Sequence, residues 1–178
     1  MDGLVTLLPE SYSTRVVELW NHLETRFGLR GARITPYPHF SWQIAARYDS
    51  SRVESVLREI AITTPPFCVS TSGLGLFPGA SPVLFIPVAK SPALIALHRR
   101  IWDSMRDIAS EPSPFYQPDR FVPHITLASG DLTPETAGAV LQELAFISFS
   151  WDLPVDHLAW ISQPTVVDSQ VKFRIPFK

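Results

Sequence analysis

Two short segments of the sequence combine a histidine with a hydroxyl residue in the same pattern. One is Pro38-His39-Phe40-Ser41-Trp42 and the other is Pro123-His124-Ile125-Thr126-Leu127. In a β-strand, residues two positions apart point to the same face. We therefore predict two strands that each present an imidazole and a hydroxyl on one face. On the first strand, the opposite face would carry Phe40, Trp42 and Ile44 into a core.

This combination suits the hydrolysis of a phosphodiester. One group must take a proton from the nucleophile, and another must protonate the leaving oxygen. Imidazole titrates near neutral pH, so His39 and His124 can hold opposite protonation states. The hydroxyls of Ser41 and Thr126 can donate hydrogen bonds to phosphate oxygens as charge builds on them. We favour His124 as the base and His39 as the acid, an order that the sequence itself leaves open.

Several loop residues are further candidates for contact with a substrate. The aromatic candidates, whose rings could stack on a nucleobase, are Phe77, Tyr37 and Tyr116. Arg120 and Arg33 precede the two histidines by four and six residues and could contact phosphate, although such arginines are more often solvent-exposed. We interpret the mid-helix His98 as structural.

Other reaction types lack their sequence signatures. No cluster of His, Asp or Glu has the spacing of metal ligands, so we predict no catalytic metal and no other cofactor. Gly73 and Gly75 are not followed by the Gly-Lys-Ser/Thr of a phosphate-binding loop. A Gly-x-Ser-x-Gly nucleophile elbow is also missing. The single cysteine, Cys68, cannot form an intramolecular disulfide, and we predict that it is buried in a strand.

Hydrophobic periodicity predicts helices alternating with strands. The helices are expected over residues 13–27, 51–60, 92–108 and 133–145, the last two opening on Ser-Pro and Thr-Pro caps. Strands are expected over residues 4–8, 39–48, 67–76, 83–88, 121–128, 147–153, 155–162 and 170–177, with a proline-rich connection at 110–118. From each histidine onward the order is strand, helix, strand, strand, a repeat of about 85 residues. This order favours an α+β fold.

Composition limits the partners that we expect. The formal net charge of −2 gives no basic excess for binding long duplex nucleic acid. A small phosphorylated ligand in a local pocket is compatible with that charge. The first residues lack the pattern of a signal peptide, and no apolar run approaches the roughly 18 residues of a membrane span. We therefore expect a cytoplasmic protein that does not bind membranes and is a monomer.

The two histidine segments resemble the signature of the 2H phosphoesterase superfamily, which is a pair of His-x-Thr/Ser-x motifs. The Leu76-Phe77-Pro78-Gly79 loop and the closing strands are similar to that family as well. The resemblance implies one bilobal domain over residues 1–178, with pseudo-twofold symmetry. Two antiparallel sheets would line a central cleft with helices outside. His39 and His124 would be catalytic, and Ser41 and Thr126 would bind phosphate, with Ser41 standing where threonine is commoner.

The resemblance also implies an activity. The chain would be a metal-independent phosphodiesterase of cyclic or 2′,5′-linked nucleotide phosphodiesters, such as those met in RNA processing. The same groups could run 2′-5′ RNA ligation in reverse. The expected partner is a small nucleotide or an RNA end. Two alternatives stay open: a binding module that holds such a ligand without turning it over, and a hydrolase of a different ester.

Overall fold

The computed structural model describes residues 1–165 and 168–178. The helices in these ranges are α1 (Glu10–Phe27), α2 (Val53–Ala61), α3 (Pro92–Ser104) and α4 (Pro134–Leu144), with 3₁₀ turns η1 (Gly31–Ile34) and η2 (Pro114–Tyr116). The strands are β1 (Asp2–Leu7), β2 (His39–Tyr48), β3 (Phe67–Ser70), β4 (Gly75–Phe77), β5 (Val83–Pro87), β6 (Ala109–Pro112), β7 (His124–Ser129), β8 (Asp152–Val155), β9 (His157–Thr165) and β10 (Asp168–Pro176).

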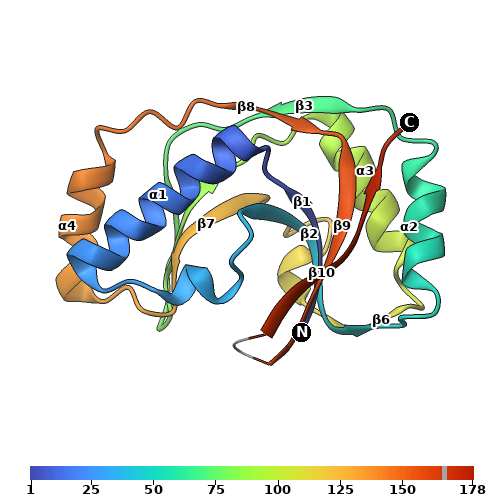
Figure 1. The fold of residues 1–178 in the computed structure, drawn as a ribbon, viewed down its shortest axis with the longest axis horizontal. Coiled ribbons are helices and arrows are strands. Elements are labelled where there is room, and N and C mark those ends of the chain that lie inside the picture. The colour runs from blue at the N-terminus through green and yellow to red at the C-terminus, as the bar shows by residue number, and fades with distance from the viewer. Residues whose placement is uncertain (166–167) are drawn as a thin grey trace.

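The strands form three antiparallel sheets. A five-stranded sheet has the order β10-β9-β1-β2-β6, a three-stranded sheet has the order β4-β5-β7, and β3 pairs with β8. The five-stranded sheet and the three-stranded sheet belong to two lobes, and the β3–β8 pair runs between them along one side (Figure 1). The helices lie on the outer sides of the two larger sheets. The α+β fold expected from the sequence is confirmed.

Two halves of the chain share one element order, and each half gives a strand to the other. The order β1-α1-β2-α2-β3-β4 corresponds to β5-α3-β7-α4-β8-β9, apart from the extra strand β6 between α3 and β7 and the closing strand β10. Strand β9 of the second half pairs with β1, and strand β4 of the first half pairs with β5. The repeat predicted from each histidine onward is only partly right, because its last strand in the first half, residues 83–88, is β5, which opens the second half. The unit that the structure repeats begins one strand and one helix before each motif strand.

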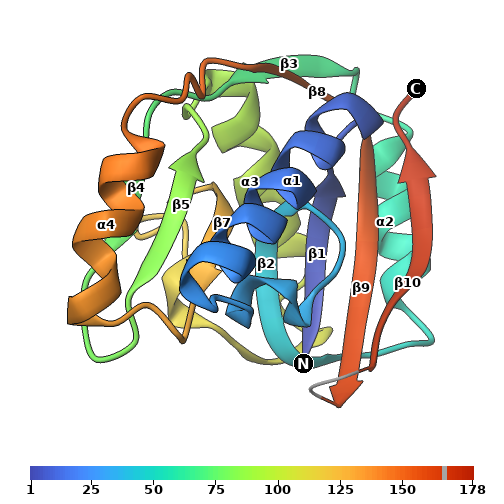
Figure 2. The ribbon, with the colours of Figure 1, turned by 60° about the vertical axis from the view of Figure 1, so that its left-hand side comes forward.

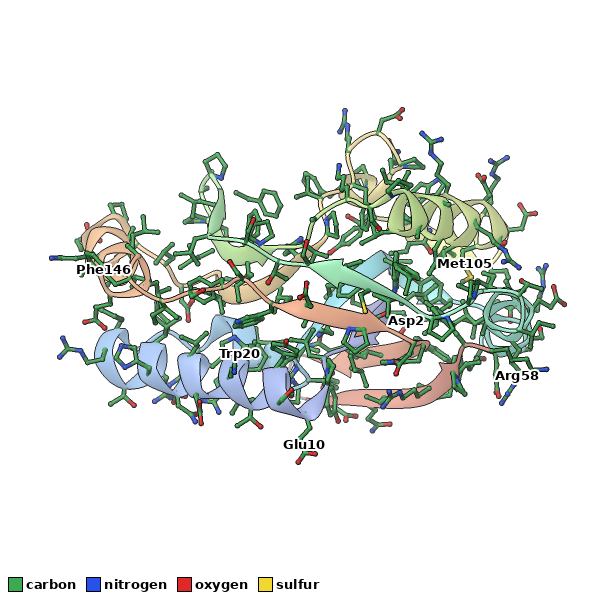
Figure 3. The ribbon with its side chains drawn as sticks, turned by 90° about the horizontal axis from the view of Figure 1, so that it is seen from above. Asp2, Glu10, Trp20, Arg58, Met105 and Phe146 are labelled. Carbon is green, nitrogen blue, oxygen red and sulfur yellow. The ribbon has the colours of Figure 1, made fainter. Side chains whose placement is uncertain are left out.

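The first helix of each half crosses to the sheet of the other lobe. Helix α1 contacts β7 and α4, whereas α3 contacts β2 and α2 (Figure 2). In α1, Val16, Trp20 and Leu23 are buried at helical spacing. Figure 3 shows Trp20 on the side of α1 that faces the body of the protein, with Glu10 pointing away. These crossings tie both motif strands into one buried hydrophobic cluster.

Several predicted boundaries are wrong. The single strand expected over residues 67–76 is split into β3 and β4, which belong to different sheets. Gly73, between them, has a φ of 67°, a conformation that glycine adopts readily and that ends a strand. Helix α3 ends at Ser104 rather than near residue 108, and part of the expected proline-rich connection forms β6 beside β2. The strand expected from residue 147 begins only at Asp152.

The prediction that Cys68 is buried is also wrong. Cys68 lies in β3, but its side chain is exposed, whereas the next residue, Val69, is buried. Alternation along a strand with one face in solvent accounts for this, because only one of two neighbouring residues can face the core. Across the described ranges, no helix has both the length and the apolar character that crossing a bilayer requires.

Candidate active site

Strand β2 presents His39 and Ser41 on one face. His39 lies opposite Leu7 of β1, and Ser41 lies opposite Val5. Residues directly opposite each other in an antiparallel pair share a face, so both side chains face the same way as Val5. Val5 belongs to a small apolar cluster separate from the main core. The imidazole and the hydroxyl of the first motif are therefore directed away from the main core, as their spacing predicts.

Strand β7 repeats this arrangement in the other lobe. His124 lies opposite Pro87 of β5, and Thr126 lies opposite Phe85. Between and after them, Ile125 and Leu127 are buried in the main core. The second motif therefore also shows its imidazole and its hydroxyl on one face. Strands β2 and β7 contact each other, which brings the two lobes together at the motifs.

Both motif strands carry a bulge at the same place. In β2 the pairing passes from Ser41 to Gln43 and skips Trp42, while in β7 it passes from Thr126 to Ala128 and skips Leu127. The skipped residue is the third after the histidine in each case. A bulge bends its strand and redirects the side chains that follow it. Each motif therefore ends on a bulge immediately after its hydroxyl residue.

The bulge in β2 overturns one prediction about facing. Strict alternation would place Ile44 in the core, opposite to His39. Instead, Ile44 is half-buried and lines the same small hollow as His39. The extra residue at the bulge shifts the alternation by one position, so Ile44 returns to the face that carries the histidine.

The two imidazoles are oriented by matching hydrogen bonds. Nδ1 of His39 lies 2.5 Å from the carbonyl oxygen of Tyr37, and Nδ1 of His124 lies 2.7 Å from that of Val122. A carbonyl oxygen can only accept, so each Nδ1 carries the proton. In the neutral ring, Nε2 is then the free acceptor. Both histidines are thus fixed in the tautomer that can take or return a proton at Nε2.

The two histidines also sense each other's charge. Burial lowers the pKa of His39, the bond to the Tyr37 carbonyl raises it, and a charge on His124 lowers it further. Burial likewise lowers the pKa of His124, against the bond to the Val122 carbonyl, which raises it. The rings are therefore electrostatic neighbours, although 85 positions separate them in the chain. The structure brings together the two imidazoles that the sequence pattern singles out.

Two phenylalanine rings support His124. The ring centroids of Phe77 and Phe85 each lie 5.1 Å from the centroid of the imidazole, with Phe77 edge-on. Gly75 allows this packing, because a Cβ at Gly75 would lie 2.3 Å from the ring of Phe85. Any larger residue there would push Phe85 out of place. Phe77, a candidate from the sequence, therefore contacts His124 directly.

A cavity of about 480 Å³ opens beside His124. Its apolar wall is formed by Phe77, Pro78, Val83, Phe115 and Val122, and its polar groups come from Ser81, Tyr116 and Arg120. This volume lies in the range of small-molecule sites, as does the mostly apolar wall with a few polar groups. The cavity therefore gathers three of the five additional substrate-contact candidates. Of the other two, Tyr37 packs beside the Val5 cluster and donates its hydroxyl to the carbonyl of Ser169.

The space beside His39 is much smaller. The hollow that His39 shares with Thr35 and Ile44 has a volume of about 30 Å³. That is room for one or two water molecules. Among the residues that the structure describes, the two halves of the candidate site therefore differ in size although their motif strands match.

Ser41 is connected to the cavity through Tyr116. Burial raises the pKa of the Tyr116 phenol, and a hydrogen bond with the Ser41 hydroxyl lowers it. The two hydroxyls are therefore neighbours. On the other motif strand, the backbone carbonyl of Thr126 accepts a hydrogen bond from Nε1 of Trp20 at 3.0 Å. Ser41 through its hydroxyl and Thr126 through its backbone carbonyl thus each bond to an aromatic residue from a distant part of the chain.

The sequence did not single out several residues that contribute to this region. Phe115 and Val122 line the cavity, and Phe85 supports His124. The pair Phe115-Tyr116, followed closely by Arg120, is a signal that could have drawn attention to this loop. Arg33 is engaged elsewhere, because its Nη1 donates to Asn21 and Glu24. No group of three or more His, Cys, Asp or Glu side chains within the described residues could hold a metal ion.

Two antiparallel lobes bring together two strands that each carry a histidine and a hydroxyl residue. The chain matches the model of the 2′-5′ RNA ligase superfamily over residues 8–165, and it belongs to that superfamily. No curated protein matches this chain in sequence.

Solved structures share the fold over almost the whole chain. TT0787 of Thermus thermophilus is 18% identical with a TM-score of 0.72, over 99% of this chain and 97% of that one. LigT of E. coli, crystallised with 3′-AMP, is 14% identical with a TM-score of 0.64, over 99% and 96%. A structure described as a phosphoesterase is 15% identical with a TM-score of 0.62, over 99% and 97%. At these identities the likeness concerns the fold.

Proposed function

We propose that this chain is a phosphodiesterase that hydrolyses cyclic or 2′,5′-linked nucleotide phosphodiesters, with His39 and His124 as its acid–base pair. The observation that carries this proposal is the mutual placement of the two imidazoles. Each has Nδ1 fixed on a backbone carbonyl, and burial lowers the proton affinity of each. Two such groups around one phosphorus can remove one proton and supply another.

The cavity beside His124 supports a nucleotide as the substrate. Its aromatic wall offers surfaces on which a base can stack, and stacking on an aromatic ring is sequence-tolerant. Arg120 supplies a positive charge at the same cavity. LigT, which shares the fold, was crystallised with a small nucleotide, 3′-AMP. Ser41 and Thr126 would donate hydrogen bonds to the phosphate oxygens.

The unequal space on the two sides suggests the direction of the reaction. A nucleoside in the larger cavity would place its ribose oxygens near His124, and the small hollow beside His39 has room for the attacking water. His39 Nε2 then takes a proton from water as the water oxygen attacks phosphorus. The bond from phosphorus to the ribose oxygen breaks, and His124 gives its Nε2 proton to that oxygen. The product is a nucleoside monophosphate, and solvent restores the two protonation states.

This assignment, with His39 as the base and His124 as the acid, is the reverse of the one that we favour from the sequence. The two motifs are alike in sequence, so the sequence offers no basis for assigning an acid side and a base side. Burial lowers the pKa of both rings, and a charge on His124 disfavours a second proton on His39, so one ring can be neutral while the other is protonated. The assignment of His39 as the base therefore rests on the unequal space on the two sides. In 2′-5′ ligation, a 5′-hydroxyl would attack phosphorus in place of water and give its proton to one histidine, while the bond to a ribose oxygen of the cyclic phosphate breaks and that oxygen takes a proton from the other histidine.

A substrate panel tests the proposal. We would compare 2′,3′-cyclic nucleotides, 2′,5′-linked dinucleotides and non-nucleotide phosphodiesters, with a His39→Ala/His124→Ala double variant as the matched blank. We expect turnover of nucleotide substrates by the wild-type protein and none above background by the double variant. Nucleotide binding without turnover across a pH series would instead indicate a binding module. Turnover of non-nucleotide esters alone would also contradict the proposal.

A further inference from the structure

His98 lies in α3, outside the cavity, and is buried. His98 is only 2% exposed to solvent. The imidazole stacks on the ring of Phe121, with centroids 3.5 Å apart and an angle of 4° between the planes. The proposed mechanism does not use this histidine. Packing alone does not explain why a histidine is buried here, because an apolar side chain would stack on Phe121 equally well.

The polar atoms of His98 are directed at two backbone carbonyls. Nε2 lies 3.1 Å from the carbonyl oxygen of Tyr116, and the carbonyl of Trp42 is a second hydrogen-bonding partner. Burial lowers the pKa of His98 to about 4, so the ring is neutral near pH 7. A neutral imidazole has a single N–H to donate. The ring therefore satisfies one carbonyl at a time, and the short contact from Nε2 favours that of Tyr116.

These two carbonyls belong to segments that meet at the candidate site. Trp42 is the bulge residue that directly follows Ser41 on β2. Tyr116 ends the η2 turn, lines the cavity beside His124 and bonds to the hydroxyl of Ser41. His98 thus contacts the backbone of both segments from behind, at the point where the hydroxyls of Ser41 and Tyr116 come together.

We propose that His98 is a positioning residue that acts through Tyr116. Its Nε2–H holds the η2 turn against α3, which packs on β2, and so keeps the Tyr116 ring at the wall of the cavity. This inference rests on the proposed function, because it takes that cavity to be the nucleotide site. His98 itself does not touch the nucleotide. Its loss should therefore weaken nucleotide binding more than it slows the chemical step.

Substitutions that move the donor test this role. His98→Phe keeps the stacking on Phe121 but removes the N–H, and a lost hydrogen bond of ordinary strength should weaken 3′-AMP binding about threefold to tenfold. His98→Gln places an amide N–H near the position of Nε2 and should stay within about twofold of the wild-type Kd. His98→Asn reaches only toward the position of Nδ1 and should bind as weakly as His98→Phe. The measurement is the Kd of 3′-AMP by calorimetry.

A double-variant cycle with Tyr116 separates positioning from general destabilisation. In a Tyr116→Ala background, His98→Phe should change the Kd by less than about twofold, because the residue through which it acts is gone. If the fold-changes in Kd caused by His98→Phe and Tyr116→Ala multiply in the double variant, the two residues act independently and the proposal is overturned. Equal Kd values for His98→Gln and His98→Asn would also overturn it. If His98→Phe fails to fold, the Gln and Asn pair still decides. Binding of 3′-AMP does not require turnover, so a wild-type protein that binds but does not hydrolyse would overturn the proposed function alone.

Discussion

His124 lies close enough to His39 for a positive charge on its ring to lower the pKa of His39. The two rings therefore titrate as a coupled pair, and the first proton settles on the partner with the smaller penalty. Burial lowers the pKa of both rings, and the repulsion between two charged rings is mutual, so the pair holds one proton before it holds two. In the proposed reaction that proton is on His124. A neutral His39 beside a protonated His124 is the state that the proposed reaction needs.

The pH dependence of kcat/KM should reflect these lowered pKa values. The base must be neutral, so activity rises with pH through the pKa of His39, which lies below 6.5. The acid must be protonated, so activity falls through the pKa of His124, which burial also places below 6.5. We expect a bell-shaped profile with its maximum on the acid side of pH 6.5. A profile still rising above about pH 8 would contradict this expectation.

A sulfur substitution tests which histidine is the acid. In a 2′,3′-cyclic nucleotide, prepared in 2′-S and 3′-S versions, sulfur replaces one bridging oxygen, and a thiolate leaves without needing a proton. His124→Ala should then recover to within about tenfold of the wild-type rate on the analogue whose sulfur is the leaving atom. His39→Ala should stay at least about 10²-fold slower, because water still needs a base. Recovery of His39→Ala instead would reverse the assignment.

Phe115 should contribute to binding the nucleobase. Its side chain is 74% exposed in the absence of ligand, at the cavity beside His124. Phe115→Ala should raise KM for nucleotides about fivefold to a hundredfold, since stacking on an aromatic ring is worth about 1–3 kcal/mol. Phe146→Ala is the matched control, because Phe146 is 91% exposed and does not line the cavity. Figure 3 places Phe146 at the α4 end of the molecule. Equal effects of the two substitutions would exclude stacking on Phe115.

The stability of the protein should decrease in acid partly because of His98. Burial lowers the pKa of His98 to about 4, with smaller effects of the same sign from Lys90 and Arg99. The unfolded chain therefore binds more protons than the folded one between about pH 6.5 and 4, and stability falls as pH falls through that window. His98→Phe should flatten the dependence of the unfolding free energy on pH there.

The control for this measurement is Phe146→Ala, since Phe146 is 91% exposed and the substitution removes no titratable group. We expect the unfolding free energy of this control variant to depend on pH as that of the wild-type protein does over the same window. The other histidines whose pKa is lowered by burial still titrate in His98→Phe, so part of the dependence of the unfolding free energy on pH should remain. An unchanged slope in His98→Phe would contradict the burial of a neutral ring.

The sequence predicts the two motif strands well because their information is local. Alternation alone places His39 with Ser41 and His124 with Thr126. The bulge that returns Ile44 to the histidine face could not be predicted, since it depends on how β2 pairs with β1. A bulge leaves no mark in the hydrophobic pattern of its own strand when the residues around it are all buried.

The unequal sides of the site were also beyond the sequence. The cavity beside His124 depends on η2, which approaches β2 because Ala109–Pro112 pairs as a strand instead of continuing α3. Helical periodicity reaching Met105 and Ile108 concealed that change, because both residues are buried although they lie beyond the end of α3 at Ser104. Tertiary pairing overrode the local preference, and the cavity-lining residue Phe115 was missed with it.

The most direct test of the central claim is a kinetic comparison of His39→Ala, His124→Ala and the double variant on one 2′,3′-cyclic nucleotide. If both rings act on a single phosphorus, each single variant should lose at least about 10² in kcat. The double variant should then be no more than about tenfold slower than the slower single variant, because residues that act as a unit are not additive. A single variant that keeps more than about a tenth of the wild-type kcat, or losses that multiply fully in the double variant, would contradict the account.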